Sequence, residues 1–321
     1  MAEQVLDRVP SLGALYANAL GRSARLMIRT PTRSTALPEV VYRVDDVPVE
    51  AEQVVAYQRV LGAAAASDAL PAGFVHVLGF PVAMAVMARE DFPLPLLGMV
   101  HIANRVDQHR ALHTGEHLGV RAWAEKLAAH RKGTQVELVV EVTGSAADGV
   151  AWRGRSTYLA KGRTLPGLPA APESAPAGAA WGDEPPQPTA QWQLAADTGR
   201  RYAEVSGDRN PIHLGSMPAR LFGFKRAIAH GMYTAARALA ASGVEHGAPG
   251  TDAFTWDVTF GRPVLLPGRV AFAVRPAEGE TGAAGGAATD GGSGATGGVE
   301  YLGWNARSGA RHFSGSVTPL V

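Results

Sequence analysis

The sequence predicts an α+β fold built from two related halves, each with one central apolar helix wrapped by a sheet of long antiparallel strands. Three observations support this prediction: landmarks that recur in both halves, alternating apolar and polar residues in the strand segments, and a proline-rich stretch between the halves. A helix against an antiparallel sheet is a stable α+β arrangement because each element buries the apolar face of the other.

The two halves share landmarks in the same order. The first set pairs Tyr57, Val60 and Gly62 with Tyr202, Val205 and Gly207. Further along, one glycine precedes an apolar helical stretch and a second precedes an alternating strand. These glycines are Gly79 and Gly115 in the first half and Gly231 and Gly268 in the second, with separations of 115 − 79 = 36 and 268 − 231 = 37 residues. Three ordered matches favour an internal duplication.

Each half contains one expected helix and several expected strands. The helices follow Gly79, over residues 80–87, and Gly231, over residues 232–241. The strands are expected at residues 100–106, 118–123, 135–142 and 150–161 in the first half, and at 254–260, 269–275, 299–305 and 312–317 in the second. Apolar and polar residues alternate most clearly at 136–142 and 254–260, as in sheets with one covered and one solvated face.

Two stretches of unusual composition divide the chain. Residues 164–190 hold seven prolines among alanine and glycine, a composition typical of a linker, so the halves are expected at residues 1–163 and 191–321. Residues 279–298 hold nine glycines and almost no large side chain, which predicts a flexible loop. The GxGxxG pattern at 292–297 lacks the preceding strand and following helix of a dinucleotide site.

The composition excludes several classes of function. The chain has 30 Lys and Arg residues against 29 Asp and Glu among 321 residues, so it lacks the basic field that binds nucleic acid. Cysteine is absent, which excludes disulfides, thiolate nucleophiles and Cys-based metal sites. No signal-peptide pattern and no apolar run of about 20 residues is found. We therefore expect a cytoplasmic protein with no nucleic-acid or membrane partner.

The segment that ends at His213 carries candidate chemistry. Asp208 and His213 are five residues apart, so they must converge through a turn, and Pro211 biases Asn210 away from helical angles. A carboxylate and an imidazole at one point can hold and deprotonate a water molecule. The alternative is structural: Asp208 as a cap, Asn210 as a turn residue and His213 as a helix-entry residue.

Residues 202–213 read Tyr-Ala-Glu-Val-Ser-Gly-Asp-Arg-Asn-Pro-Ile-His, and His-Gly-Met follows at 230–232. This pattern resembles the Tyr-x-x-x-Ser-Gly-Asp-x-Asn-Pro-x-His motif, with its downstream His-Gly-Met, of the MaoC-like, (R)-specific enoyl-thioester hydratases, or hydratase 2 family. The resemblance implies a double hotdog fold with one catalytic and one degenerate half. The matched glycines give an offset of 207 − 62 = 145, which pairs Asp208 with Ala63 and His213 with Asp68. The first half therefore lacks both catalytic residue types.

The resemblance also implies the reaction, the reversible hydration of a trans-2-enoyl thioester to an (R)-3-hydroxyacyl thioester, with no metal or redox cofactor. Asp208 and His213 would activate the water, Asn210 would orient the pair or the water, and the Gly231 amide would face the thioester carbonyl. Gly231 could alternatively serve close packing alone. His230, beside the core helix, is expected to be a packed, hydrogen-bonded histidine and not a second base.

The substrate would carry coenzyme A or the phosphopantetheine of an acyl carrier protein. Candidate phosphate contacts are Lys225, Arg226, Arg262 and Arg269, each of which could equally be a solvated surface charge. A homodimer of double hotdogs is compatible with the family. The rival functions are a hotdog acyl-thioesterase and a noncatalytic acyl-thioester binding protein. A serine hydrolase is poorly supported because the sequence has no GxSxG elbow.

Deletion of residues 279–298 is expected to leave turnover and stability close to those of the full chain, because this segment has few apolar side chains with which to dock. Steady-state kinetics and thermal melts of the deletion variant test this expectation. Loss of turnover would instead assign the segment a role at the substrate entrance.

Overall fold

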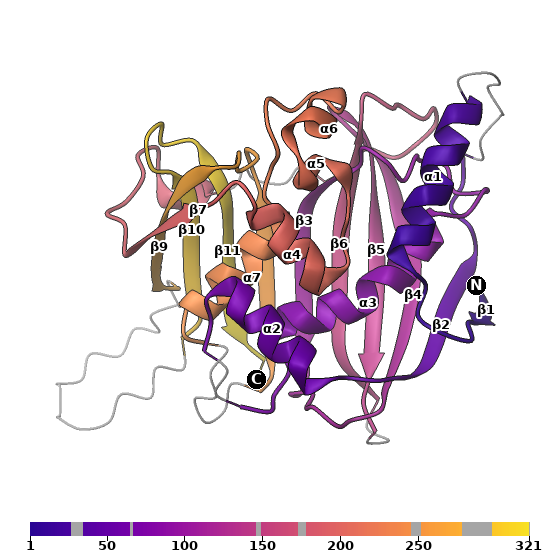
Figure 1. Cartoon of the computed structure of the whole chain (residues 1–321), viewed down its shortest axis with the longest axis horizontal. Coiled ribbons are helices and arrows are strands. Elements are labelled where there is room, and N and C mark those ends of the chain that lie inside the picture. Colours follow the sequence, from indigo (N-terminus) through magenta and orange to yellow (C-terminus); the bar gives the residue numbers. More distant parts are fainter. Residues whose placement is uncertain are drawn as a thin grey trace.

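The fold is a single large sheet with helices on one face (Figure 1). The computed structural model describes residues 1–26, 35–64, 67–145, 149–172, 178–244, 252–277 and 297–320. The strands are β1 (Ala2–Val5), β2 (Val40–Val47), β3 (Val100–Gln108), β4 (Leu118–His130), β5 (Gly133–Thr143), β6 (Val150–Lys161), β7 (Ala190–Leu194), β8 (Phe254–Phe260), β9 (Gly268–Pro276), β10 (Val299–Asn305) and β11 (Arg311–Pro319). The helices are α1 (Leu12–Leu26), α2 (Ala51–Leu61), α3 (Ala72–Met87), α4 (Thr198–Ser206), α5 (Pro211–Leu214), α6 (Ser216–Leu221) and α7 (Gly231–Ala241), with a short 3-10 helix at Ala179–Trp181.

The α+β prediction is confirmed, and the eight predicted strands correspond to β3 to β6 and β8 to β11. The helix predicted after Gly231 is confirmed as α7. The helix predicted after Gly79 is wrong at its start, because α3 begins at Ala72. Gly79 lies inside α3, where an added Cβ atom would collide with the Val140 side chain of β5. Its role is therefore to let the helix approach the sheet, not to begin the helix.

The duplication is visible in the order of the strands. Read outward from the centre, one half of the sheet runs β3-β6-β5-β4-β2 and the other runs β8-β11-β10-β9-β7, with β1 added beyond β2. Helices α2 and α4 end in the equivalent glycines Gly62 and Gly207, with φ of +72° and +71°. The equivalent Tyr57 and Tyr202 pack on each other, their ring centroids 6.1 Å apart. The two copies therefore face each other as in a pseudo-dimer.

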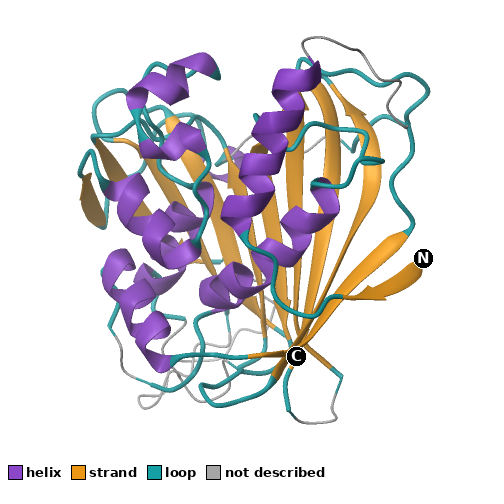
Figure 2. Ribbon diagram, turned by 45° about the vertical axis from the view of Figure 1, so that its right-hand side comes forward, coloured by secondary structure: helices purple, strands orange, loops and turns teal. Residues whose placement is uncertain are grey.

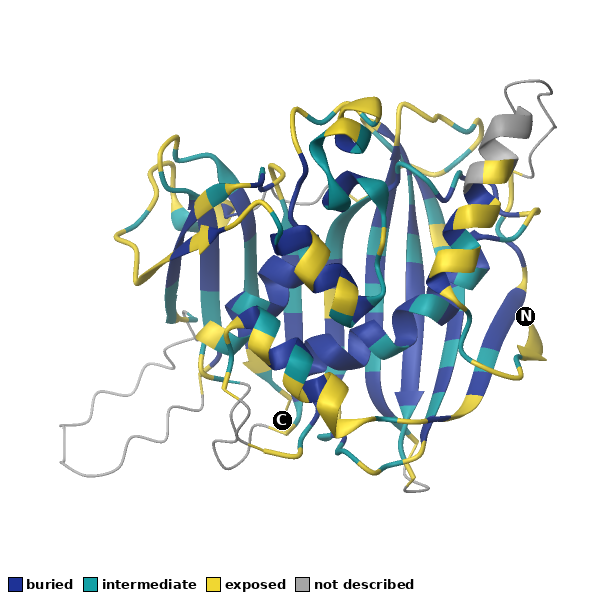
Figure 3. Ribbon diagram, in the orientation of Figure 1, coloured by how far each residue is buried: buried dark blue, intermediate teal, exposed yellow. Residues whose placement is uncertain are grey.

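The central helices share one core (Figures 2 and 3). Helix α3 is buried on nearly every side, as expected for a helix that is apolar all round. Helix α7 consists mostly of small residues, and an added Cβ atom on Gly73 of α3 would lie 2.9 Å from the Ala236 Cβ atom of α7. Small residues at this crossing let the helices pack closely beneath the sheet.

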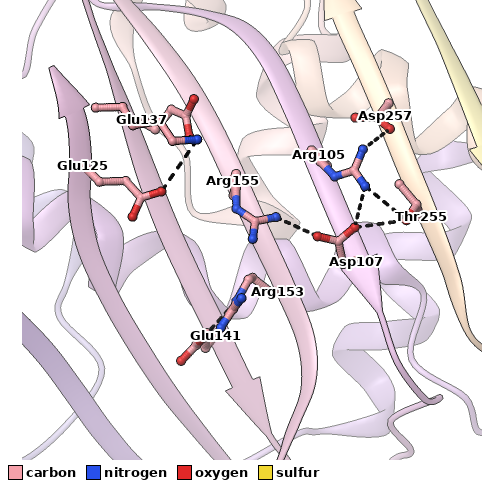
Figure 4. A network of polar contacts seen from close by, with 10 residues as sticks. Arg105, Asp107, Glu125, Glu137, Glu141, Arg153, Arg155, Thr255 and Asp257 are labelled. Atoms are coloured by element: carbon pink, nitrogen blue, oxygen red, sulfur yellow. Dashed lines mark hydrogen bonds and ion pairs between the residues drawn. The ribbon is translucent and has the colours of Figure 1, made fainter. Parts of the chain in front are cut away.

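A polar network crosses the junction between the halves on the sheet face opposite the helices (Figure 4). Arg105 of β3 contacts Asp257 of β8 at 2.9 Å, and Thr255 of β8 donates to Asp107 of β3 at 3.0 Å. Arg155 of β6 binds the second oxygen of Asp107 at 2.6 Å. Exposed ion pairs contribute little singly, but this network joins side chains at two neighbouring paired positions of β3 and β8, Arg105 with Asp257 and Asp107 with Thr255. It therefore favours one register for the junction.

The segment between the halves lies against both of them. Ala129 of β4 donates to the Pro169 carbonyl at 2.8 Å, and Gly178 donates to the Ser314 hydroxyl of β11 at 2.6 Å. The assignment of residues 164–190 as a linker stays a prediction. The glycine-rich loop predicted at 279–298 lies outside the described residues, apart from Gly297 and Gly298. Within the described ranges, no helix is both long and apolar enough to span a membrane.

Residues 1–163 and 191–321, produced separately, are each expected to be insoluble or unfolded. Separation would expose the unpaired edges of β3 and β8 and the apolar contact between α3 and α7. Solubility and circular dichroism of each fragment test this, with co-expression of the two fragments as the control. A monomeric, well-folded C-terminal fragment with full activity would contradict it.

Candidate active site

The turn between α4 and α5 brings the two predicted catalytic side chains together. Gly207 ends α4 in a left-handed conformation, and Asn210 then adopts φ −55° and ψ 124° before Pro211 begins α5. This is the non-helical Asn-Pro step that the sequence predicts. Side-chain ligand atoms of Asp208, His213 and His230 all lie within 4.8 Å of one another.

The two oxygens of Asp208 have different surroundings. Oδ1 accepts hydrogen bonds from the Tyr16 hydroxyl at 2.7 Å and from the Asn210 amide at 3.1 Å. Oδ2 lies 3.8 Å from His230 Nε2. Burial raises the pKa of Asp208, but the positive charge that His230 and His213 carry when protonated at low pH and the hydrogen bonds from Tyr16 and Asn210 outweigh it, so the pKa lies below its usual value. Asp208 is therefore a carboxylate at neutral pH.

His213 is a neutral imidazole with a defined tautomer. It is 8% exposed, and its Nδ1 lies 2.8 Å from the Ile228 carbonyl oxygen. Because a carbonyl only accepts, Nδ1 carries the proton and Nε2 keeps a lone pair. Burial, with a smaller contribution from His230, lowers the His213 pKa to about 3 against the opposing effect of Asp208. The lone pair on Nε2 is available to a bound water.

His230 is the third member of the cluster formed with Asp208 and His213, and its Nε2 already makes a hydrogen bond. Its ring stacks on His213 with 3.7 Å between centroids, and its Nε2 donates to the Asp208 backbone carbonyl at 2.9 Å. The prediction that His230 is a packed, hydrogen-bonded histidine is confirmed, since the ring is buried and Nε2 makes this hydrogen bond. Nδ1 is buried and has no hydrogen-bond partner among the described residues. Burial lowers the pKa of His230, so this ring is a neutral support for the Asp208 backbone.

One carboxylate and two imidazoles within 4.8 Å are also a donor set that a divalent cation can bind. His213 and His230 each use one ring nitrogen on a backbone carbonyl, and Asp208 Oδ1 already accepts two hydrogen bonds. Nε2 of His230 would have to give up its hydrogen bond before it could bind a cation. These hydrogen bonds favour an acid–base cluster over a metal centre.

Gly231 combines the two roles that its sequence position allows. An added Cβ atom would lie 3.1 Å from the Phe260 ring of β8, so close packing is a real constraint. Gly231 is also the first residue of α7, whose first amides have no acceptor inside the helix. Over the described ranges, no hydrogen bond from the Gly231 amide is found. This amide can therefore donate to an anion at the helix N-terminus.

The four predicted phosphate contacts are exposed residues on two separate segments. Lys225 and Arg226 precede the buried run that leads to Gly231, whereas Arg262 follows β8 and Arg269 lies in β9. In the part of the chain that the structure describes, no side chain of the four forms an ion pair with the cluster. Their role as phosphate contacts stays a prediction.

The N-terminal half supplies neighbours that sequence patterns missed. Tyr16 of α1 binds Asp208 directly. His101 of β3 stacks on Tyr158 of β6, with centroids 4.6 Å apart, and packs on Phe260 at 5.2 Å. Burial lowers the pKa of His76 to about 4, against the opposing charge of Asp208. Tyr16, His76 and His101 lie in α1, α3 and β3, and only tertiary packing brings them near Asp208, so no local spacing could have identified them.

Two copies of a helix wrapped by an antiparallel sheet define a double hotdog protein, and the Asp–His cluster in one copy is its candidate acid–base site. Comparison of the sequence with known proteins identifies the family to which this chain belongs. Residues 177–289 match the family model described as MaoC like domain. The chain is 36% identical over 259 residues to 3-hydroxyacyl-thioester dehydratase X of Mycobacterium tuberculosis, covering 80% of this chain and 88% of that protein.

Solved structures agree with this assignment. A crystal structure of HtdX from Mycobacterium tuberculosis has a TM-score of 0.69 and 31% identity, covering 87% of this chain and all 100% of that one. A conserved hypothetical protein of the same organism, described as a double hotdog, has a TM-score of 0.52 and 17% identity over 85% of this chain and 93% of its own, and supports the fold alone. The chain therefore belongs to the MaoC-like dehydratases and is an enzyme of the hydro-lyase class. The double hotdog prediction is confirmed.

Gly199→Ala is expected to lower both stability and turnover, because an added Cβ atom in α4 would collide with the His213 carbonyl of α5. Overpacking of this kind costs about 1–3 kcal/mol and would displace the imidazole. Gly21→Ala in α1 is the control, since its Cβ atom meets nothing within 4 Å. Thermal melts and kcat are measured for both. Wild-type turnover in Gly199→Ala would contradict a tight α4–α5 contact.

Proposed function

We propose that this enzyme catalyses the reversible, (R)-specific addition of water to trans-2-enoyl thioesters, giving (R)-3-hydroxyacyl thioesters, or the reverse dehydration. The observation that carries the proposal is the Asp208–His213 pair, held by the turn beside the N-terminus of α7. A relative named 3-hydroxyacyl-thioester dehydratase at 36% identity supports the substrate class. The hydration of an enoyl thioester needs a base for water, an acid for C2 and a donor for the carbonyl oxygen, and the Asp208–His213 pair and the Gly231 amide offer these three groups.

In the proposed hydration, a water molecule sits between Asp208 Oδ2 and His213 Nε2. Its oxygen attacks C3 as its proton passes to this pair, and the electrons of the C2–C3 double bond move into the thioester group. The oxygen of the thioester gains negative charge, which the Gly231 amide stabilises at the start of α7. The pair then returns one proton to C2, so the site ends in its starting state. Either Asp208 or His213 could be the first acceptor of the proton.

Asn210 acts on this chemistry through the backbone. Its amide donates to Asp208 Oδ1, and its side-chain oxygen accepts from the Ile212 amide at 3.4 Å, which caps α5. We therefore propose that Asn210 orients the pair, while the water is held by Asp208 and His213. The structural alternative for Asn210, a turn residue, is part of this role.

No metal or redox cofactor takes part in the proposed reaction, since the proton and the hydroxyl group both come from water. The substrate brings its own coenzyme A or carrier-protein phosphopantetheine, and Lys225, Arg226, Arg262 and Arg269 are exposed candidates for its phosphates. A homodimer and a cytoplasmic location remain predictions from the sequence. The catalytic residues lie in the C-terminal half, so each chain has one site.

Asp208→Asn and His213→Ala are each expected to lower kcat by about 10²- to 10⁴-fold, the usual contribution of a positioned acid or base. Asp68→Ala is the matched control, because Asp68 corresponds to His213 in the first half and its side chain is 73% exposed. Hydration of a short enoyl-CoA is followed by the loss of enoyl-thioester absorbance, with thermal melts of every variant.

Two further measurements distinguish the proposed hydratase from a thioesterase and from a noncatalytic binding protein. Chiral analysis of the product tests the (R) configuration, and a thiol reagent detects the free coenzyme A that a thioesterase would release. High activity in a folded Asp208→Asn or His213→Ala variant would place the chemistry elsewhere. Thiol release without hydroxyacyl product would favour the thioesterase, and neither product would favour a binding protein.

A further inference from the structure

We infer that Tyr16, in the N-terminal helix α1, is a positioning residue that decides which oxygen of the Asp208 carboxylate takes part in proton transfer. The inference rests on the proposed function, in which Asp208 helps to deprotonate water. It adds a residue from outside the catalytic half to the site.

The two carboxylate oxygens of Asp208 differ in the hydrogen bonds that they accept. The Tyr16 hydroxyl donates to Oδ1 at 2.7 Å across 192 residues of sequence, and the Asn210 amide donates to the same oxygen at 3.1 Å. The nearest ring nitrogen to Oδ2 is His230 Nε2 at 3.8 Å, beyond hydrogen-bond distance, and that nitrogen already donates to a carbonyl. Oδ1 is thus occupied by two donors, and Oδ2 keeps its lone pairs for water.

Helix α1 is built to hold Tyr16 in this place. Leu12, Tyr16 and Ala19 are each 7% exposed, and their spacing of four and three residues puts them on one helix face. Leu12 packs against the catalytic turn itself, since an added Cβ atom on Gly207 would lie 3.1 Å from the Leu12 Cδ1 atom. The helix therefore docks on the turn through its apolar face and presents one hydroxyl to Asp208.

Towards the Asp208 carboxylate, which only accepts, the Tyr16 hydroxyl is the donor. Burial, then the charge of Asp208 and the hydrogen bond to it, raise the pKa of Tyr16, so the phenol keeps its proton. A buried donor to a carboxylate favours the ionised form of that carboxylate, and the Tyr16 hydrogen bond lowers the pKa of Asp208 in addition to the larger effects of His230 and His213. Tyr16 therefore favours the ionised form of Asp208 and leaves Oδ2 as the oxygen that can accept a hydrogen bond from water.

Tyr16→Phe keeps the ring and removes the donor. We expect kcat/KM to fall by about 10- to 100-fold, the range that loss of one hydrogen bond to a charged group supplies. The acidic limb of the pH profile of kcat/KM should also move to higher pH. The sign follows because the ionised Asp208 is the active form: without the donor its pKa rises, so activity is lost earlier as the pH falls.

Tyr42→Phe is the matched control. Tyr42 is another buried tyrosine of the N-terminal half, and its hydroxyl accepts from Arg89 at 2.9 Å, away from the cluster. Its removal should leave the acidic limb where it is in the wild type. An unchanged limb in folded Tyr16→Phe, or an equal movement in Tyr42→Phe, would overturn the inference.

A second substitution decides the matter if Tyr16→Phe does not fold. Replacement of Tyr16 by 3,5-difluorotyrosine keeps the hydroxyl and makes it a stronger donor, so the acidic limb should move to lower pH, and an unmoved limb would overturn the inference. Asp208→Asn separates the two proposals. If that variant is active, the proposed function fails; if it is inactive while the Tyr16 variants behave as wild type, only the role of Tyr16 fails.

Discussion

The antiparallel pairing of β3 with β8 is the contact on which the rest of the molecule depends. It joins Ala103 to Thr259 at one end and Gln108 to Phe254 at the other, and makes one sheet from two half-sheets. At its middle Val106 lies opposite Trp256, both fully buried, and the Trp256 indole donates to the Tyr301 hydroxyl at 2.7 Å. Because the pairing shares one sheet between α3 and α7, neither central helix has to bury its apolar surface alone.

The two halves contribute different residues to the candidate site. Residues 62–71 connect α2 to α3 in the first copy, whereas residues 207–230 connect α4 to α7 in the second and hold α5, α6 and the catalytic turn. Asp68, the counterpart of His213, is exposed and pairs with His113 at 3.3 Å. The first copy contributes the neutral, buried imidazoles of His76 and His101 and the Tyr16 hydroxyl instead. In the proposed site, the first copy therefore contributes side chains around Asp208 although it has no counterpart of the Asp208–His213 pair.

The sequence could predict what depends on local pattern. Alternation identified the strands because a half-covered sheet needs it, and Asn210-Pro211 identified the turn between Asp208 and His213 because proline restricts the residue before it. The predicted start of α3 was wrong because Gly79 is required for a tertiary contact, the close approach of the helix to Val140 of β5, and does not mark the start of the helix. Tyr16 has no local signature at all. Its role arises from the docking of α1 on a turn 192 residues away, which no periodicity within α1 encodes.

The electrostatics of the cluster explain how one site can serve both water and thioester. His213, His230, His76 and His101 are all kept neutral by burial, so Asp208 is the one ionised group of this cluster. In the proposed hydration, a proton that reaches Asp208 removes the negative charge from the carboxylate at the moment when charge develops on the thioester oxygen. The total charge of the site then stays constant while its position moves towards Gly231. In a buried site a fixed N–H dipole interacts strongly with that charge, so the start of α7 favours the shift without any cation nearby.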